Sequence, residues 1–308
     1  MTQKTNRITE FFFNALLQLR IWQSLYPGLM HFLIIWGVTI QVIGTAINLM
    51  QMALFTPFAL ENFPRNGWYF FYEFIMDLAG VFILIGVGMA LYRRLVMKPK
   101  SLGSAWDDWF VLALLALLPL VGFTTEAMRL ISTNPPWAVY SFTGSIFAAL
   151  YRALGVTQTS AISLQQTFVL IHIFLGITFV ASIPFTKMRH LIFAPLNILL
   201  RPIRAMGAFE KVQDIDETDL LGVGKISEFK PQHLLSFDAC LRCGRCEEVC
   251  PCTSSGMSYT PRLLITNLRE AMLKTIIAPN GNGTPSNDEI SEILELVNNT
   301  TLGEHDLW

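Results

Sequence analysis

Four long apolar segments constrain the fold of this chain more than any other feature. They cover about 29–53, 68–92, 109–131 and 165–186 of the 308 residues. A helix needs about 20 predominantly apolar residues to cross a hydrocarbon core of about 30 Å, and each segment meets that length. Hydrophobic residues make up 52% of the chain and charged residues only 15%, which is not the composition of an ordinary soluble protein. The sequence therefore predicts an all-α membrane bundle.

Two further stretches leave the number of spans at four or five. Residues 137–153 are apolar but short, and they follow Pro135 and Pro136, so we expect an interfacial or re-entrant helix there and favour four spans. Residues 8–24 read as an amphipathic helix that lies on the membrane surface. No signal-peptide cleavage site is evident in residues 1–28.

The positive charges predict the orientation of a four-span bundle. Eleven Lys and Arg residues flank the spans on one side, and three flank them on the other. The eleven are Lys4, Arg7, Arg20, Arg93, Arg94, Lys98, Lys100, Lys187, Arg189, Arg201 and Arg204; the three are Arg65, Arg129 and Arg152. Cytoplasmic flanks carry the excess, so both termini are predicted in the cytoplasm of a prokaryote, with the protein in its cytoplasmic (inner) membrane. The net charge of −1 and the absence of a large basic patch argue against a nucleic-acid partner.

Four of the five cysteines form the run Cys240-x2-Cys243-x2-Cys246-x3-Cys250-Pro251. This spacing is that of bacterial ferredoxins, in which the thiolates ligate a [4Fe–4S] cluster. Disulfide frameworks occur in small secreted domains, and zinc sites favour pairs of cysteines far apart in the sequence. The run therefore predicts a cluster held by Cys240, Cys243, Cys246 and Cys250.

Three histidines fall in or beside the apolar segments, where ionisable side chains are rare and usually functional. His172 and His190 are 18 residues apart, which is about 27 Å on one helix, so we place them near opposite faces of the membrane. His31 opens the first span and is matched in depth with His190, as a bis-histidine haem b requires. His172 has no histidine at its depth; Gln41 occupies that level instead.

The stretches LMHFLIIWGVTIQVIGT and HIFLGITFVASIPFTKMRH resemble the gamma-subunit cytochrome b of respiratory nitrate reductases. That family carries four haem-ligating histidines on two spans. The resemblance implies that His31, His172 and His190 stand at three of these positions and Gln41 at the fourth. We expect one haem b at the inner level, and a second haem at His172 stays open.

The run from Leu234 to Leu273 resembles the ferredoxin domain of heterodisulfide-reductase-type iron–sulfur proteins. The order of the two parts is similar to fusions such as electron-transfer-flavoprotein:menaquinone oxidoreductase. Relatives of that type carry a second cysteine run, and in two-cluster ferredoxins the fourth cysteine of each run ligates the other cluster. Cys240, Cys243 and Cys246 would then need an outside ligand, from a missing C-terminal region or a partner subunit, unless Cys250 or Cys252 closes the site locally.

Polar side chains near the predicted outer ends of two spans suggest a quinone pocket. Glu73 and Asp77 share one face of the second span, and Glu126 and Arg129 lie near the outer end of the third. A carboxyl group there could exchange protons with a quinone. An ion-pair network that stabilises the bundle, such as Asp77 with Arg129, explains the same residues equally well.

These features predict three parts: an amphipathic cytoplasmic segment (1–28), a cytochrome b-like membrane domain (29–204) and a small α-rich, ferredoxin-like cytoplasmic [4Fe–4S] segment (205–308), apparently incomplete at its C-terminus. The expected function is that of a quinone-linked oxidoreductase subunit that passes electrons between the cluster, haem b and menaquinone or another quinone. Its soluble partner would be an electron-transfer flavoprotein or a disulfide-reductase-type protein. The alternative is a membrane anchor or assembly subunit that docks a catalytic iron–sulfur partner.

Overall fold

The computed structural model describes residues 7–51, 53, 67–99, 102–201, 223, 226–257 and 260–277. All regular secondary structure in these ranges is helical, which confirms the predicted all-α fold. The chain divides into two compact units. We call Leu19–Lys98 with Ala105–Thr186 the bundle unit. Met1–Gln18, Pro99–Ser104 and Lys187–Trp308 form the cysteine unit.

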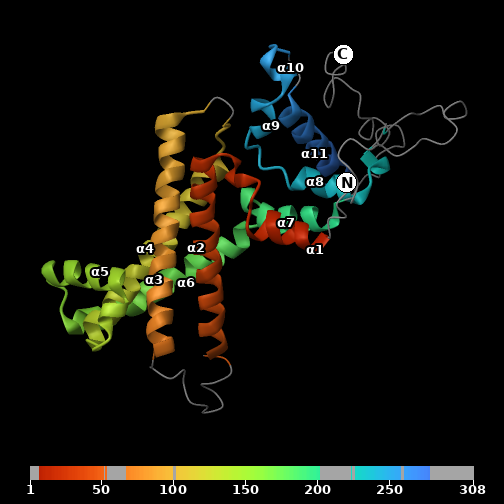
Figure 1. Ribbon diagram of the computed structural model, residues 1–308. Helices are drawn as coiled ribbons and strands as arrows, with labels where there is room; N and C mark the ends of the chain where they lie inside the picture. Colours follow the sequence, from red (N-terminus) through yellow and green to blue (C-terminus); the bar gives the residue numbers. More distant parts are fainter. Residues whose placement is uncertain are drawn as a thin grey trace, which may run out of the picture. The chain divides into compact units, whose positions relative to one another are not determined.

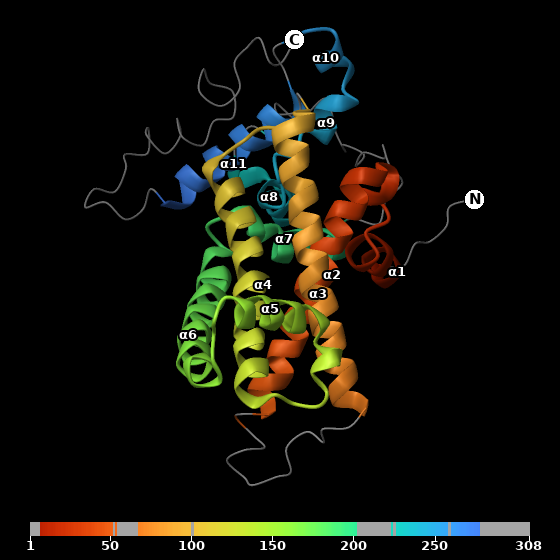
Figure 2. The same cartoon turned by 90° about the vertical axis from the view of Figure 1, so that its left-hand side faces the viewer.

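Four helices of the bundle unit are long and apolar enough to cross a membrane, as the sequence predicts. They are α2 (Leu25–Met50), α3 (Gly67–Tyr92) with its continuation η4 (Arg93–Met97), α4 (Trp106–Thr133) and α6 (Gln158–Ser182). The 137–153 stretch instead forms η5 (Ala138–Tyr140) and the short α5 (Phe142–Ala153), which lies across the direction of α2 and α3 (Figures 1 and 2). The structure thus agrees with four spans.

The helices begin earlier than the apolar segments do, for local reasons. α2 includes Pro27 in its first turn, where the missing N–H of proline has no intrahelical acceptor to lose. α6 begins at Gln158 because the Thr157 side chain accepts a hydrogen bond from the Ser160 backbone N–H, which caps the helix. Polar capping residues therefore set the start of α6, rather than the first apolar residue.

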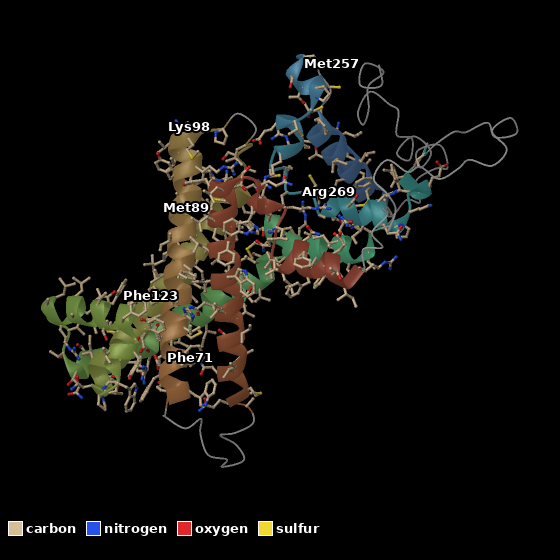
Figure 3. The ribbon with its side chains drawn as sticks, in the orientation of Figure 1. Phe71, Met89, Lys98, Phe123, Met257 and Arg269 are labelled. Atoms are coloured by element: carbon tan, nitrogen blue, oxygen red, sulfur yellow. The ribbon has the colours of Figure 1, made fainter. Side chains whose placement is uncertain are left out.

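The helices α2 and α3 pack closely because small residues lie between them (Figure 1). A Cβ atom on Gly37 would lie 2.8 Å from the backbone oxygen of Ala79, and one on Gly86 would lie 2.6 Å from Ile34 Cγ1. Phe71 and Lys98 mark the two ends of this α3–η4 rod in Figure 3. Only glycine permits this backbone approach at position 37.

The helix α4 forms the centre of the bundle unit and packs against α3, α5 and α6. Its buried residues Ala127, Met128, Leu130 and Ile131 form a core with Ala148 of α5 and Ala161 of α6. In contrast, the most apolar windows of α2 and α6 are only 11% and 0% buried. The two helices that carry the candidate ligands His31 and His172 thus contain few fully buried residues.

The single amphipathic helix predicted over residues 8–24 is wrong. The structure has α1 (Arg7–Phe11), the π-helical η1 (Phe12–Leu16) and the 3₁₀ turn η2 (Ile21–Gln23). Gln18 separates them because its φ of 56° is left-handed, which no right-handed helix accommodates. Apolar side chains of α1 and η1 are nevertheless exposed, as a membrane-surface segment requires.

The cysteine unit is built on helices that hold the cysteine run. They are η6 (Lys187–Arg189), α7 (His190–Leu200), η8 (Ile226–Glu228), α8 (Pro231–Asp238), α9 (Arg245–Glu248), α10 (Pro251–Ser254) and α11 (Pro261–Ile277). Ile226, Phe237, Leu268, Ala271 and Met272 form its core. α1 packs against α7, where Arg201 pairs with Glu10 at 2.6 Å.

Candidate redox and quinone sites

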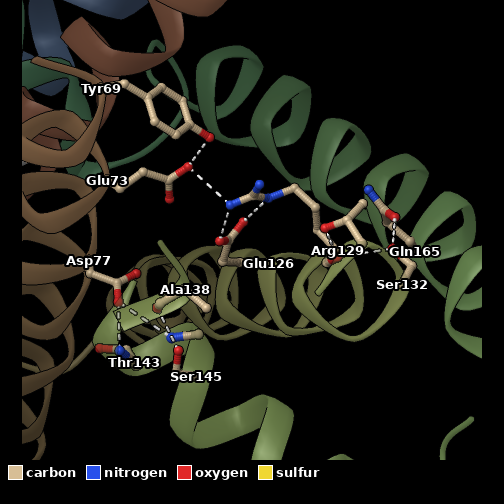
Figure 4. A network of polar contacts seen from close by, with 12 residues as sticks. Tyr69, Glu73, Asp77, Glu126, Arg129, Ser132, Ala138, Thr143, Ser145 and Gln165 are labelled. Atoms are coloured by element: carbon tan, nitrogen blue, oxygen red, sulfur yellow. Dashed lines mark hydrogen bonds and ion pairs between the residues drawn. The ribbon is translucent and has the colours of Figure 1, made fainter. Parts of the chain in front are cut away.

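The first candidate site is a chain of charged side chains between α3 and α4 (Figure 4). Arg129 donates to Glu126 Oε2 through Nε at 2.8 Å and to Glu126 Oε1 at 2.5 Å. The same guanidinium donates to Glu73 Oε1 at 3.0 Å, and the Tyr69 hydroxyl donates to that oxygen as well. We call these four residues the Arg129 cluster. It holds two carboxyl groups against one cation, an arrangement that can take up a proton without losing its ion pair.

Asp77 does not pair with Arg129, the ion pair suggested from the sequence. Its Oδ2 accepts hydrogen bonds from the backbone N–H groups of Thr143 at 2.6 Å and Gly144 at 3.4 Å (Figure 4). These amides open α5, where the first N–H groups of a helix lack intrahelical acceptors. A carboxylate there also complements the positive end of the helix dipole. Asp77 of α3 therefore caps α5. It lies one helical turn beyond Glu73 and contacts α5, whereas Glu73 contacts Arg129 of α4.

Aromatic rings surround the same end of α3. Phe70 stacks on Tyr140 with ring centroids 4.6 Å apart, and Tyr69 meets Trp137 edge to face at 6.3 Å. These rings bring apolar surface next to the Arg129 cluster. A flat ring with polar oxygens, such as a quinone head group, has the chemistry that such a mixed lining accommodates.

His172 lies on the α4 side of α6. A Cβ atom on Gly122 would lie 3.3 Å from His172 Cε1, so the imidazole fits against a position that has no side chain. Its Nδ1 is buried and makes no hydrogen bond of good geometry with the described residues, although the backbone of Leu118 lies close enough to act on the ring. A buried polar atom without a good hydrogen bond is costly and often marks a place where a ligand binds. Glu126 follows Gly122 by four residues on α4, so His172 is one helical turn from the Arg129 cluster.

His190 has the hydrogen bond expected of a histidine that ligates a metal. Its Nδ1 lies 2.5 Å from the backbone oxygen of Lys187. An N–H at Nδ1 that donates to this carbonyl leaves the lone pair on Nε2, the nitrogen that a haem iron needs. Burial lowers the pKa of His190 below its ordinary value, and the nearby positive charge of Arg189 adds to this. The residue thus fits the ligand role through its tautomer and its neutral form.

The depth argument for His172 and His190 assumed one continuous helix, and that assumption is wrong. α6 ends at Ser182, before Pro184, and His190 begins the separate helix α7. Ile183 still has helical dihedral angles. Pro184 has no backbone N–H, so it cannot donate to the preceding turn. The two histidines also belong to different compact units. His31 is the seventh residue of α2 and is half-buried in the bundle unit.

Gln41 is engaged within the bundle unit. Its Nε2 donates to the backbone oxygen of Met76 at 2.9 Å, which ties α2 to α3. Gly44, three residues later, approaches Met76 from the same helix. At the position where the resemblance implies a fourth haem ligand, this chain therefore has a helix-to-helix hydrogen bond.

The cysteine run forms a loop between α8 and α10. Arg242 and Gly244 have left-handed φ values of 54° and 77°, so the backbone turns twice between Cys240 and Cys246. Burial raises the pKa of Cys246, and the neighbouring Cys243 adds to the rise. A hydrogen bond from the Thr253 backbone N–H lowers the pKa of Cys250. Cys246 is thus affected by the charge of a neighbouring cysteine, whereas Cys250 is engaged with the start of α10.

Thiol donors at this spacing have the chemistry that an iron–sulfur cluster requires. Within the residues that the structure describes, however, no three His, Cys, Asp or Glu side chains come close enough to hold a metal ion. The helix α11 holds the loop through an ion pair, in which Arg262 of α11 contacts Glu247 of α9 at 3.0 Å. The thiols have the chemistry to hold a cluster, but among the described residues they do not surround one common point.

The sequence did not single out several residues that the structure places in these sites. Tyr69 joins the Arg129 cluster, Thr143 and Gly144 hold Asp77, and Asp238 accepts a hydrogen bond from Arg189 Nε at 3.3 Å. Tyr69 could have been found, because it lies four residues before Glu73 on the same helix face. The other contacts join residues 49 to 67 positions apart, and no local pattern signals them.

Known proteins are similar to this chain along most of its length. The family model described as "Nitrate reductase gamma subunit" matches residues 30–207. The chain is 29% identical over 273 residues to an "EtfAB:quinone oxidoreductase" of Syntrophomonas wolfei, which covers 85% of this chain and 37% of that protein. It is 28% identical over 267 residues to a "Probable iron-sulfur-binding oxidoreductase FadF" of Bacillus subtilis, with 86% of this chain and 37% of that protein covered.

A third similarity is confined to a short stretch. Over 64 residues the chain is 42% identical to a "Probable membrane-anchored ferredoxin" of Chromohalobacter salexigens, which covers 20% of this chain and 10% of that protein. The chain spans little more than a third of the length of the two relatives that it matches along most of its length. No solved structure matches it.

Helical spans, half-buried histidines and a ferredoxin-type cysteine run define a membrane protein of the electron-transfer oxidoreductase class. Within that class, the chain belongs to the nitrate reductase gamma subunit family. The family match includes His31, His172 and His190 and ends before the cysteine run. The cysteine run follows in the same chain, as expected for a fusion with an iron–sulfur segment.

Proposed function

We propose that this chain passes electrons between a cytoplasmic [4Fe–4S] cluster, an inner-level haem b and the quinone pool of the cytoplasmic membrane. The observation that carries the proposal is the Nδ1 hydrogen bond of His190 to the Lys187 carbonyl, within the part of the chain that matches a family for which haem b is expected. The ferredoxin-type run begins 50 residues after His190 in the same chain. Haem and cluster supply one-electron chemistry when bound, and the protein sets ligation and surroundings.

His31 and His190 are the proposed axial ligands of the haem. The assignment rests on the family match, on the depth of His31 near the start of α2 and on the tautomer of His190. A second haem at His172 remains the less favoured possibility, since Gln41 uses its amide to tie α2 to α3. We assign Cys240, Cys243 and Cys246 to one cluster and Cys250 to a second cluster that a further cysteine run would complete.

The Arg129 cluster is the proposed proton-exchanging wall of a quinone pocket. A quinone takes up two protons with two electrons, so its site needs a group that can give or accept protons. Glu73 and Glu126 share one guanidinium, and the buried imidazole of His172 lies against Gly122, one helical turn from Glu126 along α4. Asp77 takes no direct part in this proposal, because its carboxylate caps α5.

By similarity to the EtfAB:quinone oxidoreductase, the soluble partner would be an electron-transfer flavoprotein. We propose menaquinone or another quinone as the membrane acceptor. A disulfide-reductase-type protein is the other candidate partner. The alternative function is a membrane anchor that docks an iron–sulfur partner and carries no quinone chemistry of its own. The two functions differ in whether quinol reduces the haem of the purified chain.

Absorption spectroscopy of the purified chain tests the haem assignment. We expect the dithionite-reduced protein to show a bis-histidine b-type spectrum, and His31→Ala and His190→Ala each to lose it. His233→Ala is the matched control, because His233 lies in α8 and its backbone carbonyl accepts a bond from Ser236. A full haem spectrum in both ligand variants would refute the assignment.

A further inference from the structure

Within the cysteine unit, Arg189 is placed between a proposed haem ligand, His190, and the cysteine run. It is the last residue of η6, and the next residue is His190. Its Nε donates to the backbone oxygen of Asp238 at 3.3 Å. Asp238 is the last residue of α8, and Cys240 follows two residues later. One hydrogen bond therefore connects the neighbour of a proposed haem ligand with the helix end that leads into the cysteine run.

The contact has a physical reason at its α8 end. The last carbonyl groups of a helix have no intrahelical donor and carry the negative end of the helix dipole. A guanidinium satisfies both needs, since it is always charged and donates in a fixed plane. α7 packs against α8 along the same boundary, so the hydrogen bond belongs to a packed interface.

Asp238 is held from the opposite side as well. Arg269 of α11, labelled in Figure 3, donates to Asp238 Oδ1 at 2.9 Å. The preceding residue, Phe237, is 4% exposed and lies in the core of the unit. The backbone N–H of Cys240 donates to the Phe237 oxygen at 3.3 Å. The position of Cys240 is thus determined by the end of α8, which Arg189 and Arg269 hold between them.

We propose that Arg189 is a positioning residue for electron transfer between the haem and cluster sites. This proposal rests on the proposed function. Arg189 sets the separation of His190 and Cys240. The path runs from the backbone of His190 through the hydrogen bond of Arg189 to Asp238 and then along the two residues that lead to Cys240. A structural cap and a positioning residue both stabilise α8, and only a positioning residue also controls the rate at which haem is reduced through the cluster.

The test uses the full chain in lipid nanodiscs, with Arg189→Gln, Arg189→Lys and the control Arg201→Gln. Arg201 lies just beyond the other end of α7 and pairs with Glu10, so its loss breaks an ion pair of the same unit away from α8. The first measurement is amide hydrogen exchange of residues 231–239 without added cofactors. We expect R189Q to raise exchange there about tenfold, as loss of one charge-assisted hydrogen bond implies, and R201Q to leave it unchanged.

The second measurement is haem reduction by stopped flow after photochemical reduction of the reconstituted cluster. We expect R189Q to slow this step with haem and iron contents unchanged, R189K to fall in between, and R201Q to match the wild type. Wild-type exchange and a wild-type rate in R189Q would overturn the proposal. Raised exchange with a wild-type rate would reduce Arg189 to a structural cap and also overturn it.

A variant that fails to fold and a wild-type protein that passes no electrons have separate consequences. If R189Q does not fold, R189K carries the test: intermediate exchange and rate support the proposal, and wild-type values contradict it. If the wild-type protein binds both cofactors but passes no electrons between them, the proposed function fails. In that case the positioning role fails with it, while the exchange data still show whether Arg189 holds α8.

Discussion

The Arg129 cluster and the cysteine loop present two different ways of arranging reactive groups. In the bundle unit, Arg129 pairs with both Glu73 and Glu126 at 2.5–3.0 Å. In the cysteine unit, no three candidate ligands of the described residues converge on one point. Charges in an apolar bundle must find partners within the chain, because an unpaired charge there is costly. Thiols carry no such requirement, and a metal centre is what draws them together.

The largest expected effect is the loss of cluster binding when cysteines of the loop are replaced. Cys240→Ser, Cys243→Ser and Cys246→Ser should each abolish cluster binding, because each removes a thiolate ligand. Cys250→Ser should retain the cluster of this run, since Cys250 is engaged with the Thr253 backbone N–H rather than with the other three. Iron and sulfide analysis with electron paramagnetic resonance after anaerobic reconstitution measures this. Loss of the cluster in Cys250→Ser would instead show that the run closes locally.

A smaller effect is expected at the Arg129 cluster. Arg129→Gln leaves two partly buried carboxyl groups without their cation, which should destabilise the bundle unit by about 3 kcal/mol, the low end for a broken buried pair. Arg152→Gln is the matched control, because Arg152 is exposed and its contacts with Leu130 and Asn134 are long, at 3.5 and 3.4 Å.

Thermal unfolding in detergent, followed by circular dichroism, compares the two arginine variants. Glu126→Gln combined with Arg129→Gln should recover part of the loss, because the double variant removes one of the two uncompensated carboxyl groups. Equal stability of Arg129→Gln and Arg152→Gln would show that the cluster is not an interdependent network.

The smallest effect on stability is expected from the packing of α2 against α3, the helix that carries Tyr69 and Glu73 of the Arg129 cluster. Gly37→Ala should destabilise the α2–α3 pair by about 1–3 kcal/mol, because its Cβ would meet the Ala79 backbone oxygen. Gly88→Ala has open space around its Cβ and should cost nothing. Melting temperatures of the two variants decide this point, and a Gly37→Ala protein as stable as Gly88→Ala would contradict the close approach of the helices.

Much of the fold follows from the sequence, and most of what does not follow depends on contacts between residues far apart in the chain. Apolar length predicts the four spans, and Pro27 and Thr157 explain where α2 and α6 begin. Cysteine spacing predicts the donor set, but not its geometry. The cap of α5 by Asp77 and the contact of Arg189 with Asp238 could not be predicted, because each joins residues on helices far apart in the chain. The break at Pro184 was visible in the sequence and was missed.

Quinol-driven haem reduction tests the central claim most directly. The full chain with reconstituted haem, in nanodiscs, is mixed anaerobically with a reduced menaquinone analogue, and the absorbance of haem b is followed. The account predicts reduction that a quinone-site inhibitor blocks, that is lost in His190→Ala and that is slowed in Glu73→Gln combined with Glu126→Gln. A haem that dithionite reduces and quinol does not would contradict the account and favour the anchor function.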